Sequence, residues 1–161
     1  MNRLVYSNIA INALNSAKFQ KTQLLSLDEQ LSHIQTEIML YRVKQVDMNA
    51  IVYEQMREQN IKNNRMMIIN AIANDIYMSI NNAINAIKIS IQQNNSTMII
   101  LDDYMLQNIA NFINEYYKSN ELQLAIKNIC NTTMIKYEIA ILINNKQRFL
   151  PGLINLNNVL S

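Results

Sequence analysis

The chain has 161 residues, half of them hydrophobic and 16% charged, with a formal net charge of +2 at pH 7. This length suits one domain with its own core. One glycine and one proline in the whole chain exclude folds built on strands and tight turns, which need many more of both residues. We therefore predict an all-α fold over residues 1–161: a single-domain bundle of about five helices, with long antiparallel helices and a short docked C-terminal segment.

Two helices are predicted in the first 58 residues. An apolar row at helical spacing predicts the first over residues 2–23, and a capping-box pattern that begins at Ser26 and places Glu29 three residues later starts the second, over residues 26–58. The sequence leaves open whether the chain breaks between them or continues as one helix.

The second of these segments carries the most regular apolar pattern in the chain. Its apolar positions recur in steps of three and four residues at Leu24, Leu27, Leu31, Ile34, Ile38 and Tyr41, and the same register resumes at Met48 and Val52 after the polar Gln45. A second row lies about 100° around the same helix, at Met39, Val43, Val46 and Ala50. Two rows favour a helix packed within its own bundle over a rod-like oligomerisation coiled coil. The polar run 57–65 is where we expect the chain to reverse direction.

A third helix, over residues 66–92, is predicted to be the central one, because Ile68 and Ile89 lie outside its main apolar stripe. The polar stretch 93–97 indicates a loop. A fourth helix is predicted over residues 97–118, with Ser96 or Thr97 as its N-cap.

The last long helix is predicted over residues 120–144 and has two apolar faces. One face joins it to the core, and nearly opposite it lies a candidate interaction face formed by Leu124, Ile135, Ile139 and Leu142. Two apolar faces require two partners, so the second face is either covered within the chain or shared with another molecule. In the tail, residues 145–161, the pair Pro151-Gly152 predicts a turn before a short docked segment.

Groups that could catalyse a reaction are scarce. His33 is the only histidine, and the row Glu29, His33, Glu37 on one helix favours helix-stabilising pairs over a divalent metal site. Asp102 and Asp103 are adjacent, so their side chains point about 100° apart on a helix, which disfavours a catalytic carboxylate pair. Cys130 is the only thiol, and a buried free thiol is the ordinary finding at such a position. No catalytic, cofactor-binding or metal-binding residue is predicted, and we expect a protein that is not an enzyme and needs no cofactor.

The expected partner is therefore another protein or a second copy of the chain. Lysines and arginines are scattered rather than gathered in a basic stripe, which disfavours nucleic acid. A helical nucleic-acid-binding module, and then a metal-dependent helical enzyme, are the alternatives. The ten methionines indicate core filling, or alternatively a methionine-lined binding surface. No apolar stretch is long enough to span a membrane, and no signal peptide is recognisable, so we expect a cytoplasmic protein or one assembled from the cytoplasm. The many Ile and Asn residues indicate an AT-rich genome, viral or bacterial.

Overall fold

The computed structural model describes residues 2–45, 47–115, 120–145 and 149–161. These residues form six helices and no strand, in the following order: α1 Arg3–Val43, α2 Met48–Gln92, α3 Ser96–Glu115, α4 Asn120–Thr132, α5 Ile135–Asn145 and α6 Pro151–Leu160. The all-α prediction is confirmed. The predicted count of five helices is not, and neither is the predicted bundle, since only α1 and α2 are long.

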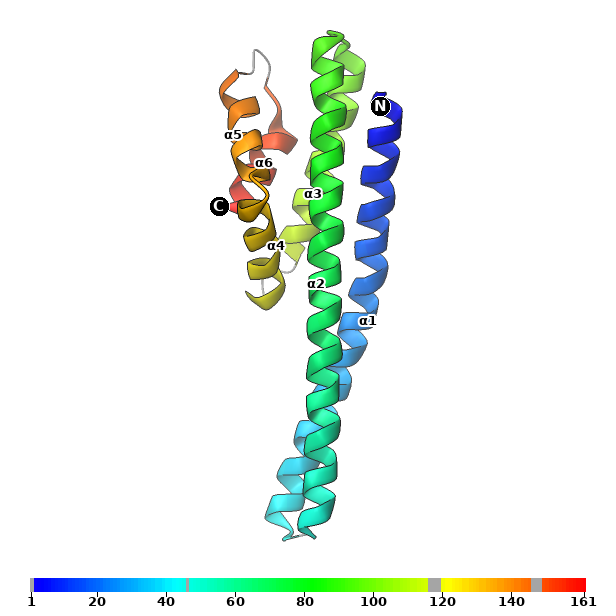
Figure 1. Ribbon diagram of the computed structural model, residues 1–161, viewed down its shortest axis with the longest axis vertical. Helices are drawn as coiled ribbons and strands as arrows, with labels where there is room; N and C mark the ends of the chain where they lie inside the picture. The colour runs from blue at the N-terminus through cyan, green and yellow to red at the C-terminus, as the bar shows by residue number, and fades with distance from the viewer. Residues whose placement is uncertain (1, 46, 116–119, 146–148) are drawn as a thin grey trace.

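The two long helices lie antiparallel as a hairpin (Figure 1). They touch closely near their open end, where the Ser79 hydroxyl donates a 2.7 Å hydrogen bond to the backbone carbonyl of Ala10. Further along, Asp75 accepts hydrogen bonds from Ser16 and Gln20. The capping-box sequence around Ser26 lies inside α1, so the chain has no break there and continues as one helix.

The chain reverses direction between Val43 and Met48, so the predicted reversal in the polar run 57–65 is wrong. Gln45 adopts a left-handed conformation with φ of 54°, and the Asp47 carboxylate caps α2 by accepting from the Asn49 amide. The polar run stays helical because its charges form pairs along α2 or with α1, such as Lys62 with Glu58. Polarity in this run reflects ion pairs on a helix surface, not a loop.

The four shorter helices pack on only one half of the hairpin, the half that holds the chain's N-terminus (Figure 1). This half contains the main core, to which all six helices contribute. In it α3 begins with the Asn95 side chain as its cap, accepting from the Met98 amide, rather than with the predicted Ser96 or Thr97. No helix within the described residues is long and apolar enough to cross a membrane.

The predicted helix 120–144 is divided into α4 and α5 by a turn at Thr133 and Met134. The Thr133 hydroxyl donates to the Ile129 carbonyl at 2.6 Å, which competes with the regular helix pattern, and Met134 has a left-handed φ of 65°. The turn rotates the second apolar face inward, so that Ile135 and Ile139 enter the same core as Ile126. The main core thus covers the part of the second face that lies on α5, while Leu124 on α4 stays exposed.

The tail forms α6, which docks against α3. Leu153, Leu156 and Leu160 are buried, and the Asp103 carboxylate accepts hydrogen bonds from the Gly152 and Leu153 amides at 2.8 and 2.9 Å. An acidic side chain from one helix therefore caps the start of another, where unpaired amides favour negative charge.

Candidate interaction surface

The half of the hairpin far from the shorter helices consists of two helices only. We name residues 29–45 and 47–64 the distal hairpin. Its core is a separate small cluster in which Ile34, Ile38 and Ile61 are buried, with Leu31 and the neighbouring Leu27 packed against them. No residue of α3–α6 belongs to this cluster, so the outward sides of both helices there have no covering layer within the described chain.

Large apolar side chains are exposed on these outward sides. Seven lie between positions 39 and 56: Met39, Leu40, Val43, Met48, Val52, Tyr53 and Met56. On α1, the row of Met39, Leu40 and Val43 is followed directly by the exposed Lys44. On α2, Met48, Val52 and Met56 recur every four residues, which places them on one side of the helix. Exposed apolar side chains gathered in this way are typical of protein–protein contact surfaces.

The sequence alone predicts one helix over residues 26–58, in which Met48 and Val52 continue the apolar row that ends at Tyr41. Because α1 ends at Val43 and α2 begins at Met48, the exposed residues instead belong to two helices and face away from each other. The distribution of charge could have shown that a new helix begins near Met48. If a helix starts at that position, all charged residues from there to Asp75 fall on one of its sides.

A groove with a volume of about 620 Å³ lies between α2 and α4. Apolar side chains of Met66, Leu124 and Ile129 line it together with the amides of Asn70 and Asn74. The groove is open to solvent. Its α2 residues Met66, Asn70 and Asn74 continue the four-residue spacing of Met48, Val52 and Met56 on the same side of α2, at the point where α4 begins to cover that side. One side of α2 is therefore covered by α4 from Met66 onward and is exposed between Met48 and Met56.

The predicted interaction face does not exist as one exposed surface. Leu124 is exposed and lines the groove beside α2. Ile135 and Ile139 are buried in the main core, and Leu142 is partly buried against it. The break between α4 and α5 is the physical reason, since the four residues share a face only on an uninterrupted helix. Of this set, Leu124 alone remains available to a partner.

The residues considered for metal binding or catalysis have other roles. His33 Nε2 lies 3.0 Å from Glu37 Oε1 on an exposed helix side, and no group of three potential metal ligands occurs among the described residues. Burial raises the pKa of the Cys130 thiol to about 12, so this thiol is protonated and unreactive at neutral pH.

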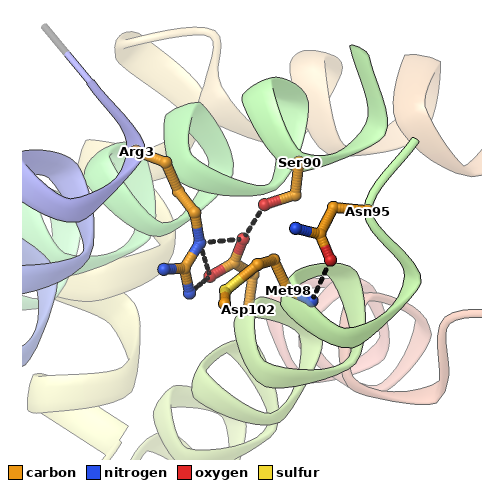
Figure 2. A network of polar contacts seen from close by, with 5 residues as sticks. All are labelled: Arg3, Ser90, Asn95, Met98 and Asp102. Atoms are coloured by element: carbon orange, nitrogen blue, oxygen red, sulfur yellow. Dashed lines mark hydrogen bonds and ion pairs between the residues drawn. The ribbon is translucent and has the colours of Figure 1, made fainter. Parts of the chain in front are cut away.

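Asp102 and Asp103 are both buried and point to different neighbours. Asp102 accepts hydrogen bonds from Arg3 and from the Ser90 hydroxyl, and so joins the starts of α1 and α3 to the end of α2 (Figure 2). Asp103 holds α6 through the Gly152 and Leu153 amides. Both carboxylates are fully engaged in holding helices together, which supports a structural role and not a catalytic pair.

A third polar cluster lies where the distal hairpin meets the shorter helices. Arg65 on α2 pairs with Asp28 on α1 and with Glu121 on α4, at 2.5 Å in each case. Partial burial by itself would lower the pKa of Arg65, but the hydrogen bonds and charges of Asp28 and Glu121 together raise it above its ordinary value. The cluster fixes the position at which α4 begins to cover α2.

Comparison with protein-family models, with curated proteins and with solved structures found no match to this chain.

Proposed function

We propose that the protein is a non-enzymatic interaction or assembly protein that self-associates through the distal hairpin. The observation that carries this proposal is the exposure of seven large apolar side chains on two helices that no other helix of the described residues covers. The main core, by contrast, is covered from several sides by α3–α6.

Energetics support contact with another molecule at this surface. Full burial of a methionine, valine or leucine side chain contributes roughly 1.5 to 3 kcal/mol, and the seven side chains are now largely exposed to water. The small core of Ile34, Ile38 and Ile61 is a modest source of stability for two projecting helices. A partner packed on the outward sides would bury further apolar surface there, as α3–α6 do for the part of α2 that lies in the main core.

The shape of the surface favours a helical protein partner over a small molecule. Small ligands bind in concave pockets that enclose most of their surface, whereas Met48, Val52 and Met56 project from the convex side of a helix. Apolar residues repeated every three or four positions are how one helix packs against another.

Light scattering coupled to size-exclusion chromatography tests the proposal. The wild-type chain is expected to show a mass above the 18.7 kDa of one copy, rising with protein concentration. A double variant Val43→Glu and Met56→Glu, which charges the outward sides of α1 and α2, is expected to run as one copy.

A matched control changes two equally exposed apolar residues outside the distal hairpin, Phe19→Glu and Ile100→Glu. This variant should associate as the wild type does. A wild-type mass of 18.7 kDa at every concentration up to the millimolar range, or equal behaviour of both double variants, would contradict the proposal.

A further inference from the structure

The two outward sides of the distal hairpin differ in charge. On α2, residues 48–75 include six charged side chains, Glu54, Arg57, Glu58, Lys62, Arg65 and Asp75. At about 100° per residue these six fall within an arc of about 140° on the side that faces α1. The opposite side of α2 has none. The outward side of α1 is flanked by the exposed Arg42 and Lys44.

Each of the six charges on α2 already has a partner within the chain. Glu54 pairs with Arg57 and Glu58 with Lys62. Arg65 binds Asp28 and Glu121, and Asp75 accepts from Ser16 and Gln20, as described above. The outward side of α2 therefore offers a partner only apolar and amide side chains, so a charged partner would lose hydration there without gaining an ion pair.

The exposed row on α2 is complementary to itself. Met48, Val52 and Met56 are 68%, 46% and 63% exposed, with the two methionines at equal distances in sequence on either side of the valine. When a second α2 lies antiparallel with Val52 opposite Val52, each Met48 lies opposite a Met56. A two-fold axis at this point makes the same patch bind itself, as in most dimers.

We infer that a second copy of this chain packs antiparallel on the outward side of α2, with the two-fold axis at Val52. This inference rests on the proposed function and specifies the surface and the geometry. The flanking side chains Asn49, Gln55 and Gln59 can exchange amide hydrogen bonds at the rim of the contact, so no charge is buried.

The position of α4 favours the antiparallel arrangement. Residues 47–57 of each copy overlap in it, and α4 begins to cover the same side of α2 only at Met66, about nine residues or roughly 14 Å further along the helix. The shorter helices then lie at opposite ends of the dimer. A parallel pair would bring the two α4 helices to the same place and would make them collide.

Such a contact is small. An overlap of about eleven residues a helix lies below the area of stable interfaces, so a weak dimer is expected. Covalent trapping measures a weak contact and its register together, which makes it the appropriate experiment.

The experiment uses single cysteine variants of the full chain, oxidised with copper phenanthroline and followed by non-reducing electrophoresis. Val52→Cys should form a disulfide-linked dimer. Met48→Cys alone and Met56→Cys alone should each form at least fivefold less disulfide-linked dimer than Val52→Cys. An equimolar mixture of these two variants should form the dimer, because position 48 of one copy lies opposite position 56 of the other. Val43→Cys on α1, at the most exposed of these positions, is the collision control and should give little dimer. The native Cys130 is fully buried and does not compete.

Other outcomes overturn the inference. Dimers from Met48→Cys alone and Met56→Cys alone would indicate a parallel pair, and equal dimer from Val43→Cys would indicate contact through α1 or random collision. If light scattering shows association but Val52→Cys forms no dimer, this geometry is wrong while the proposed function stands. If the wild type never associates, both fail.

Discussion

Arg3 and Asp102, 99 positions apart in the sequence, form an ion pair with 2.6 Å between Nη2 and Oδ1. Arg3 Nε also lies 3.1 Å from each carboxylate oxygen. The Ser90 hydroxyl donates to Oδ2 of the same carboxylate, which is almost fully buried. This cluster joins α1, α2 and α3 at the open end of the hairpin (Figure 2).

Removing one partner of this pair should destabilise the protein strongly. Arg3→Ala leaves a buried carboxylate without its cation, and a loss of about 3 kcal/mol in the free energy of unfolding is expected. Ser90→Ala removes one buried hydrogen bond to a charged carboxylate and should cost about 2 kcal/mol. Urea unfolding followed by circular dichroism measures both. In a double-mutant cycle, Arg3→Ala combined with Asp102→Ala should cost clearly less than the sum of the single changes; additive costs would argue against the pair.

Gly152→Ala should displace α6 from α3. A Cβ atom at this position would lie 2.0 Å from the Asp103 backbone oxygen, a distance at which one helix must move. We expect faster amide hydrogen exchange at Leu153 and Leu156, which are protected by this docking, and a lower free energy of unfolding. Asn158→Ala, an exposed change in the same helix, is the control and should leave the exchange of α6 unchanged. Wild-type protection in Gly152→Ala would show that the close approach to α3 does not constrain α6.

Met134→Gly should stabilise the protein. The left-handed φ of 65° at Met134 costs a residue with a Cβ atom about 1 kcal/mol relative to glycine, and its side chain is exposed, so little packing is lost. A gain of about 0.5 to 1 kcal/mol is expected from thermal or urea unfolding. Gln35→Gly, at an exposed position inside α1, should instead cost about 0.5 kcal/mol. A loss at both positions would contradict this account of the α4–α5 turn.

The thiol of Cys130 should make stability depend on alkaline pH. Burial raises its folded pKa to about 12 from an ordinary value of 9.0, so between these values the unfolded chain releases a proton that the folded chain retains. The contribution is fully present below pH 9 and is lost as pH rises toward 12, by up to about 1.4 kcal/mol per pH unit. Urea unfolding from pH 8 to pH 10.5 should show a shallower decline for Cys130→Ala than for the wild type. Parallel declines would argue against this effect.

The sequence alone determined the secondary structure class. A chain with one glycine and one proline cannot make the turns of a sheet fold, and apolar residues at steps of three and four predict helices wherever they occur. These are local properties, so they can be read without the fold. The stripe from Ile69 to Ile87, predicted as the central helix, is the buried side of α2.

Tertiary structure decided where the helices end and which apolar faces remain exposed. The reversal at residues 44–47 uses a left-handed Gln45 and a capping Asp47 instead of glycine or proline, and the break at Met134 brings Ile135 and Ile139 into a core already containing Ile126. Periodicity shows that a face is apolar, but only packing shows whether another helix covers it. For this reason the predicted face on the last helix proved to be mostly buried, and the exposed row of Met48, Val52 and Met56 emerged only from the fold.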